Sequence, residues 1–211
     1  MEAEPIQFGG SPHRLQGWLL FLLEQAGRLG LAPVSQERLH LLLFYCAVLT
    51  PVHGMEQPVP KILKHRDRPF YPEAQEEILS LVVRGFVGTT TREAVSDLGW
   101  ESDGYWVTDD GLSVAERLKA TSWGKSTSRF VRDLVMGFAE LDPDDADDIV
   151  EQDALFRDDR LQRGHIRDIV KENQAAEAAK LVADYDVDGL KPDPRDSIAL
   201  YFEFLQARRA A

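Results

Sequence analysis

Between residues 71 and 120 the hydrophobic periodicity changes from helical to extended and back to helical, and this stretch constrains the fold more than any other. Pro72 suits the first turn of a helix, and Gly85 suits its end. The apolar residues between them recur at helical spacing, so we predict an amphipathic helix here. Its inner side is formed by Ile78, Leu79, Leu81, Val82 and Val83.

Two short strand signals follow this helix, at residues 94–96 and 105–108. The polar residues 102–104 lie just before the second signal and predict the turn of a two-stranded wing over residues 97–108. A further amphipathic helix then runs to Lys119. This order of elements, a helix, a strand, a loop, a strand and a helix, predicts a winged helix. The alternative is an ordinary helix and hairpin in another kind of α+β domain.

The charge of this unit argues against DNA binding. The third helix of a winged helix normally enters the major groove, and phosphate contacts supply most of the non-specific affinity for DNA. Here the solvent face of that helix and the predicted wing are both acidic. The helix carries Glu73, Glu76 and Glu77, with only Arg84 opposing them, and the wing carries Asp97, Glu101 and Asp103. We therefore expect the unit to contact protein.

The overall charge agrees with this expectation. The chain of 211 residues has a net charge of −12, which disfavours a free-standing binder of nucleic acid or of an anionic membrane. Cys46 is the only cysteine, which excludes an intrachain disulfide and a cysteine-based zinc site. No basic segment precedes an apolar one near Met1, and the apolar run 39–49 is too short to cross a bilayer. We expect a cytoplasmic protein without a membrane partner.

The first part of the chain contains two more predicted helices, after a loose leader of residues 1–10. One runs over Pro12–Arg28, and the other is capped by Ser35. Residues 39–49 of the second helix are apolar on all sides, so it should be buried nearly everywhere. Such a helix is either the centre of the core or part of a core shared with a partner.

The connector between residues 50 and 68 holds the densest basic cluster of the chain. Lys61, Lys64, Arg66 and Arg68 are candidates for contact with an anion, or with DNA inside a larger complex, and they could also dock an acidic partner. The bland alternative is a solvated loop. Residues 61–64 are expected to form a single helical turn.

Beyond Ala120 the pattern is helical. Predicted helices cover residues 123–139 and 175–182. Between them, another helix is predicted after the acidic run 142–148, with Ile149, Val150, Leu155 and Phe156 as its apolar residues. The last helix starts at Pro194, with Asp193 as its cap. We therefore predict a mostly α-helical chain. Residues 1–120 form a winged-helix core with a small β-hairpin, and residues 121–211 form a helical C-terminal extension.

The last helix carries an apolar stripe of Ile198, Tyr201, Phe202 and Leu205. Helices that dock into a partner's groove use anchors at this spacing. We expect the stripe to be completed by another chain, and the alternative is that it folds back on the core.

Asp184, Asp186 and Asp188, followed by Gly189, match the first half of a calcium-binding EF-hand loop. Arg195 stands at the twelfth loop position, where a bidentate glutamate should close the coordination shell. These aspartates are therefore weak metal candidates, and we expect no bound metal or cofactor. The five histidines show neither metal-ligand spacing nor a nucleophile motif, so we do not expect an enzyme. His40, flanked by leucines, is expected to be a satisfied core histidine.

The order of predicted elements in the first part of the chain resembles a known family. These elements are two leucine-rich helices, the connector from residues 61–64 to residues 69–72, the helix end from Ile78 to Phe86 and the wing from Tyr105 to Gly111. The family is the small middle-component subunits of bacterial three-component ABC-ATPase systems, such as Lamassu-type antiphage systems. The plan is also similar to the winged-helix kite subunits of SMC-like complexes. The resemblance covers about residues 14–120.

This resemblance implies a non-catalytic subunit that binds an SMC-like or Rad50-like ATPase and helps to couple DNA sensing to an effector nuclease. DNA would then be contacted only within the complex. Two alternatives stay open. One is a winged-helix transcription regulator that reads DNA through residues 61–68, and the other is a small hydrolase without a recognisable motif.

Overall fold

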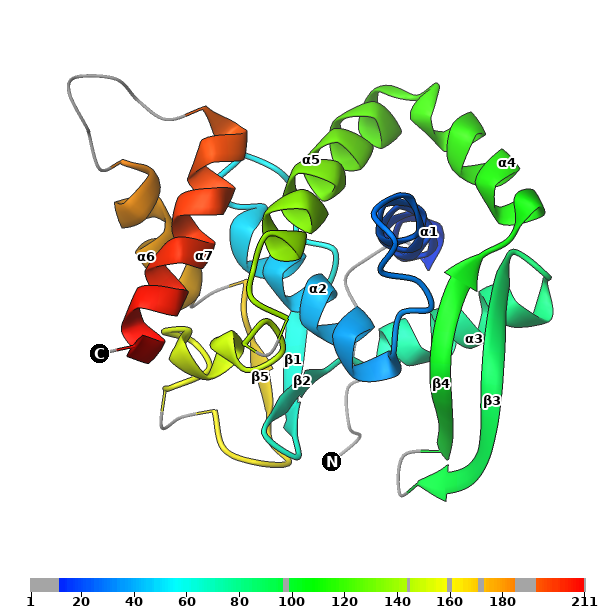
Figure 1. The fold of residues 1–211 in the computed structure, drawn as a ribbon, viewed down its shortest axis with the longest axis horizontal. Helices are drawn as coiled ribbons and strands as arrows, with labels where there is room; N and C mark the ends of the chain where they lie inside the picture. The colour runs from blue at the N-terminus through cyan, green and yellow to red at the C-terminus, as the bar shows by residue number, and fades with distance from the viewer. Residues whose placement is uncertain are drawn as a thin grey trace, which may run out of the picture.

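A computed structural model describes residues 12–96, 99–143, 145–158, 161–170, 173–184 and 193–210. The described chain is mostly helical and carries two small antiparallel sheets (Figure 1). The helices are α1 (Pro12–Arg28), α2 (Gln36–Leu49), α3 (Pro72–Val83), α4 (Asp109–Lys119), α5 (Ser122–Ala139), the 3-10 helix η1 (Ile149–Gln152), α6 (Gln174–Ala183) and α7 (Pro194–Ala210). The strands are β1 (Lys61–His65), β2 (Arg68–Phe70), β3 (Val87–Ser96), β4 (Gly99–Val107) and β5 (Ile166–Asp168).

Helix α2 lies at the centre of the core. All of its residues from Leu39 to Leu49 are buried, and it packs against α1, α5, α6 and two strands. The Ser35 hydroxyl accepts a hydrogen bond from the Arg38 N–H and caps the helix as predicted. Each large apolar side chain buried in this way contributes about 1.5–3 kcal/mol. The core of this chain therefore covers α2 by itself.

Helix α3 and the hairpin β3–β4 occupy the stretch where a helix and hairpin were predicted. Gly85 adopts a left-handed φ of +76° just after the helix. The predicted turn is wrong, because residues 102–104 lie inside β4, which begins at Gly99, and β3 already ends at Ser96. Gly104 serves a close approach instead: a Cβ on it would lie 2.6 Å from the Cβ of Pro33.

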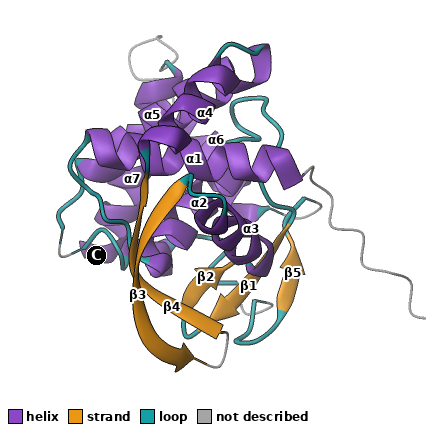
Figure 2. Ribbon diagram, turned by 90° about the vertical axis from the view of Figure 1, so that its right-hand side faces the viewer, coloured by secondary structure: helices purple, strands orange, loops and turns teal. Residues whose placement is uncertain are grey.

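The second sheet has the strand order β2-β1-β5. Residues 61–64, expected as a helical turn, form a strand, which corrects that prediction. Leu63 pairs with Phe70 of β2 on one side and with Ile166 of β5 on the other. Arg66 and Asp67 make the tight turn at positive φ, although they lack the Asn-Gly signature of such turns. Figure 2 shows the strands of both sheets at one end of the molecule, below most of the helices.

Helix α5 follows α4 after a sharp corner. Thr121 caps α5 by accepting the Gly124 N–H at 2.9 Å, and α5 packs on both α1 and α7. The helix predicted after the acidic run is only the short η1, because the backbone at Asp153 is extended. One cluster of buried apolar side chains runs through the parts before and after residue 120. The division into residues 1–120 and 121–211 stays a prediction.

The apolar stripe of α7 belongs to this core. Ile198, Tyr201, Phe202 and Leu205 are each exposed by 1% or less. The Phe202 ring meets the edge of Tyr45 at 4.9 Å, and α5, α6 and η1 pack along the helix. The expectation that another chain covers the stripe is therefore corrected. Among the described residues, no helix is both long and apolar enough to cross a membrane.

Candidate functional site

The residues of the predicted basic cluster, Lys61, Lys64, Arg66 and Arg68, interact with different parts of the chain. The Arg68 guanidinium donates to the Asp147 carbonyl and to the Asp148 carboxylate. The Lys64 ammonium donates to the Phe156 carbonyl at 3.2 Å and lies 4.4 Å from the centre of the Phe156 ring. Lys61 and Arg66 also interact with other residues. The four side chains do not converge on one anion site.

Arg68 instead belongs to a clamp on the acidic run. Arg38 of α2 donates twice to Asp147, and Arg209 of α7 contacts Asp145 and Asp148 at 3.1 and 3.3 Å. The hydrogen bond from Arg68 is the main reason that the pKa of Asp148 lies below its ordinary value. Three arginines from distant elements thus neutralise a segment that would otherwise repel itself. Arg68 therefore has a structural role in this clamp.

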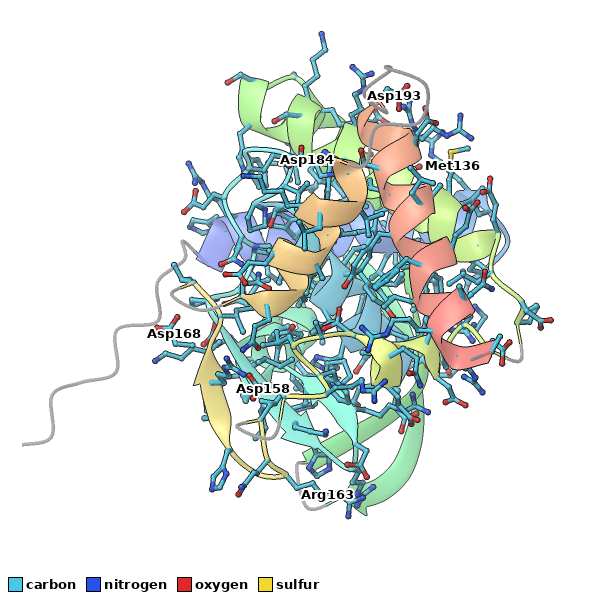
Figure 3. All side chains as sticks on the ribbon, turned by 90° about the vertical axis from the view of Figure 1, so that its left-hand side faces the viewer. Met136, Asp158, Arg163, Asp168, Asp184 and Asp193 are labelled. Atoms are coloured by element: carbon cyan, nitrogen blue, oxygen red, sulfur yellow. The ribbon has the colours of Figure 1, made fainter. Side chains whose placement is uncertain are left out.

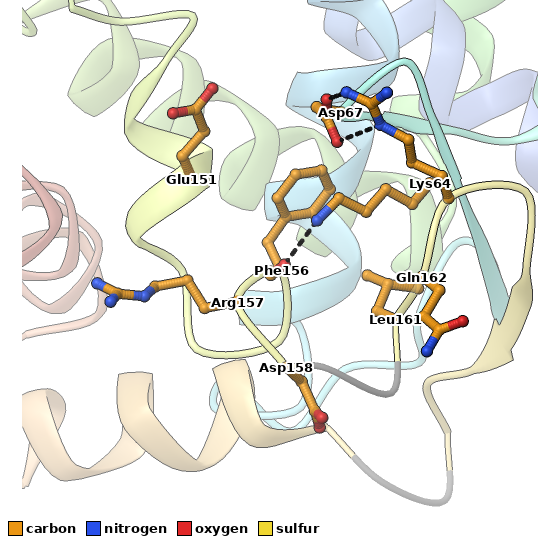
Figure 4. Close-up of a pocket in the computed structure, with 9 residues that line it drawn as sticks. Lys64, Asp67, Glu151, Phe156, Arg157, Asp158, Leu161 and Gln162 are labelled. Carbon is orange, nitrogen blue, oxygen red and sulfur yellow. Dashed lines mark hydrogen bonds and ion pairs between the residues drawn. The ribbon is translucent and has the colours of Figure 1, made fainter.

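A cleft of about 760 Å³ opens beside Lys64 (Figure 4). It is lined by Lys64, Asp67, Glu151, Phe156, Arg157, Asp158, Leu161, Gln162 and Arg163. Burial lowers the pKa of the Lys64 ammonium, and the charge of Arg163 adds to the effect. Shifted pKa values cluster at functional sites, which makes this cleft a candidate site.

Charged side chains in and beside the cleft form ion pairs with one another. Arg163 donates to Asp67 at 2.9 Å, and Arg167 pairs with Asp158 at 2.7 Å. Figure 4 shows the Glu151 and Arg157 side chains directed away from the Lys64 ammonium. The cleft therefore presents neither a convergent set of cations nor a nucleophile with an adjacent base.

A buried carboxylate, Asp153, lies near the centre of the molecule and was missed by motif reading. It accepts hydrogen bonds from the N–H groups of Leu155 and Phe156 at 2.8 and 3.2 Å, and from the Tyr201 hydroxyl. Burial raises its pKa to about 6, against the opposing effect of these donors. Its exposure is 0%, so it cannot touch a substrate. Asp153 holds the chain after η1 against α7.

His40 is a satisfied core histidine, as predicted. Its Nδ1 accepts the Tyr71 N–H at 3.2 Å, so the proton resides on Nε2, which donates to Gln75 Oε1 at 3.2 Å. The Gln75 amide in turn donates to the Tyr105 hydroxyl. Burial lowers the pKa of His40 to about 4. This relay joins α2, α3 and β4 and fixes the hairpin against the helices.

The outer face of α3 is acidic along its first two turns. Glu76 is exposed, Glu73 is half-buried with its pKa raised by burial, and Glu77 accepts from the Gln16 amide at 2.6 Å. At the end of the helix Val83 is 87% exposed, the most exposed of the large apolar side chains that the structure describes. The side chains of Asp97, Glu101 and Asp103 lie outside the described residues.

The calcium motif lies mostly outside the described residues, which include Asp184 but neither Asp186 nor Asp188. Figure 3 shows Asp184 and Asp193 at neighbouring ends of α6 and α7. The Asp193 carboxylate accepts the N–H groups of Arg195 and Asp196, so Arg195 lies in the first turn of a helix. Among the described residues no three His, Cys, Asp or Glu side chains gather into a possible metal site.

These observations place no catalytic constellation among the described residues, and they leave the acidic face of α3 as the most distinctive free surface. Compared with known proteins, the chain matches no family model, no curated protein and no solved structure.

Proposed function

We propose that this chain is a non-catalytic accessory subunit that binds an SMC-like or Rad50-like ABC ATPase in a bacterial defence or DNA-maintenance complex. In this proposal α1 to α3 and the hairpin β3–β4 form a winged helix that contacts protein. An effector nuclease is a second expected partner, and DNA is contacted only within the complex.

The connection between Val34 and the hairpin supports the winged-helix interpretation. Val34 lies between α1 and α2 and exchanges two backbone hydrogen bonds with Tyr105 of β4, at 2.9 and 2.8 Å. A winged helix likewise has a short extended segment between its first two helices that pairs with the last strand of the wing. Apart from β1 and β2, which lie between α2 and α3, the order α1, Val34, α2, α3, β3, β4 agrees with that plan.

The link between α2 and α3 departs from the plan of DNA-binding helix-turn-helix proteins. Those proteins use a turn of about three or four residues. Here residues 50–71 intervene, and they form the strands β1 and β2. The tight pairing of helices that presents a recognition helix to the major groove is therefore missing, which favours a protein-binding use of this unit.

The single observation that carries the proposal is the surface of α3. The helix that would enter the major groove presents Glu73 and Glu76 around its first turns and ends at the exposed Val83. Carboxylates meeting phosphate oppose binding to DNA, whereas a helix with carboxylates in its first turns and an exposed apolar residue at its end suits a protein surface that carries basic residues. A regulator reading DNA through residues 61–68 has less support, because Lys64 and Arg68 are held by contacts within the chain.

Co-purification tests the proposal. The chain is expressed with a tag together with the products of its neighbouring genes, treated with nuclease, and analysed by mass spectrometry. We expect a large ATPase to be retained after nuclease treatment. Retention of no ATPase would contradict the proposal.

A fluorescence anisotropy titration with labelled duplex DNA separates the regulator from the accessory subunit. The isolated protein should bind more weakly than about 1 µM at physiological salt, the strong end of non-specific affinity. Tight, sequence-specific binding by the protein alone would favour the regulator.

A further inference from the structure

A hollow of about 290 Å³ lies where α1, α4 and α5 meet, away from the acidic face of α3. Four of its six lining residues are cationic, the other two are neutral and polar, and none is acidic. The lining residues are Gln25, Lys119, Lys125, Ser128, Arg129 and Arg132. Such a concentration of positive charge is unexpected in a chain whose net charge is −12.

The hollow is built mainly by one face of α5. Lys125, Ser128, Arg129 and Arg132 stand at positions i, i+3, i+4 and i+7, which share one side of a helix. With a rise of 1.5 Å per residue, this row spans about 10 Å along the helix. Lys119, at the end of α4, joins the row from across the corner at Thr121.

Two of the four cations already have partners. Lys119 contacts the buried Glu24 at 2.5 Å and Glu116 at 2.9 Å, and Arg132 contacts the adjacent Asp133 at 2.9 Å. These pairs hold the two side chains in place at the edges of the hollow.

The other two cations, Lys125 and Arg129, are exposed and form no ion pair within the described ranges of the chain. The charge of Arg129 reaches Asp193, whose pKa is lowered mainly by the Asp196 N–H and less by Arg195 and Arg129. Lys125 therefore supplies positive charge that no ion pair within the described ranges offsets, and Arg129 adds charge that also acts on Asp193.

Two neutral polar residues also line the hollow. Gln25 of α1 is only 7% exposed as a residue, and its amide is not among the buried side-chain groups that lack a hydrogen bond. Ser128 of α5 is half-buried. Both side chains can donate a hydrogen bond to an oxygen of a ligand.

We propose that this hollow binds the phosphate groups of a small anion, such as a diphosphate or a nucleoside triphosphate. Lys125 and Arg129 balance the charge of the ligand, and Gln25 and Ser128 donate hydrogen bonds to its oxygens. A volume of about 290 Å³ holds one or two phosphate groups, with any base lying outside. The negative charge of the whole chain repels long polyanions more strongly than a small ligand. This site is independent of the α3 surface and goes beyond the accessory role.

Isothermal titration calorimetry of the full chain with pyrophosphate, and separately with ATP, at constant ionic strength tests the site. The variant carries Lys125→Gln together with Arg129→Gln, both at exposed positions. The matched control is Arg117→Gln, which removes an exposed cation from α4 that does not line the hollow. Circular dichroism confirms that each variant is folded.

We expect saturable binding to the wild type and the control, and binding at least tenfold weaker to the double variant. Equal affinity for both ligands would identify the phosphates as the recognised group, whereas tighter binding of ATP would add a contact with the nucleoside. The proposal is overturned if neither ligand binds, if the double variant binds as the wild type does, or if the control loses as much affinity. Binding of duplex DNA but not of pyrophosphate, abolished in the double variant, would also overturn it.

Discussion

Arg38 of α2 holds Asp147 through two parallel hydrogen bonds, from Nε to Oδ1 at 2.9 Å and from Nη2 to Oδ2 at 2.6 Å. The two residues are 109 positions apart. This pair anchors the acidic run to the central helix, and Arg68 and Arg209 complete the clamp. The segment that follows the run, from η1 to Phe156, then packs into the core.

Arg38→Gln should destabilise the protein modestly. The pair is partly exposed, with 30% of the Arg38 side chain accessible, so we expect a loss of about 0.5–1 kcal/mol. In a domain of this size that corresponds to a decrease of about 1–4 °C in Tm. Arg38→Lys should not restore the loss, because an ammonium cannot make the paired contact. Thermal unfolding at low and at 1 M salt checks this, and a difference that persists unchanged at high salt would contradict an ionic cause.

The stability of the protein should depend on pH through two buried groups of opposite sign. The folded state keeps Asp153 protonated up to about pH 6, whereas the unfolded chain releases that proton near pH 4, so this group lowers the unfolding free energy as pH rises through that window. The folded state keeps His40 neutral down to about pH 4, so this group lowers the unfolding free energy as pH falls below about 6.5. Each effect is on the order of 3 kcal/mol, and in the wild type they largely cancel.

Asp153→Asn should remove one of these opposing effects. The variant should then lose stability steeply between about pH 6.5 and pH 4, where the wild type changes little. Urea unfolding at pH 4.5 and pH 7 measures the difference. Parallel pH profiles for the two proteins would show that Asp153 titrates normally in the folded state.

Phe202→Asp should unfold the isolated protein. The Phe202 ring is 1% exposed and meets Tyr45 and Phe138, so an aspartate there would be a buried, unpaired charge. Phe202→Ala should cost about 3–5 kcal/mol. Chemical denaturation monitored by circular dichroism measures both. A folded Phe202→Asp protein with an unchanged Tm would restore α7 as an interface helix.

Helix positions were predictable from the sequence because their signals are local. Ser35, Thr108 and Asp193 cap α2, α4 and α7 through hydrogen bonds to residues two or three positions ahead, and each sits where capping rules place it. The burial of α2 was predictable as well, because no polar side of that helix exists to face water.

Several of the errors involve partners far away in the chain. β1 pairs with the nearby β2 through a turn that lacks the usual Asn-Gly signature, and on its other side Leu63 pairs with Ile166, about a hundred residues later, which no local rule contains. Gly104 was assigned to a turn, but it allows Pro33 to approach the strand. A hydrophobic stripe does not reveal what covers it, so the sequence could not predict that Phe202 is buried within the chain.

The candidate sites also differ in whether they depend on local spacing or on contacts between distant residues. The acidic face of α3 was visible in the sequence because it needs only helical spacing. The row from Lys125 to Arg132 carries the same kind of signal, with cations at i, i+4 and i+7, but it is less dense than the basic cluster at residues 61–68. The partners that hold Arg68 and Lys64 could not be predicted, because they come from residues 147–156.

The central claim is that the end of α3 binds a protein partner, and paired surface variants test it most directly. Val83 on α3 and Leu181 on α6 are 87% and 74% exposed, so Val83→Asp and Leu181→Asp should both fold with unchanged Tm. The measurement is the amount of ATPase retained by each tagged variant in co-purification. We predict that Val83→Asp loses the ATPase while Leu181→Asp retains it at the wild-type level. Retention of the ATPase by Val83→Asp would contradict the account.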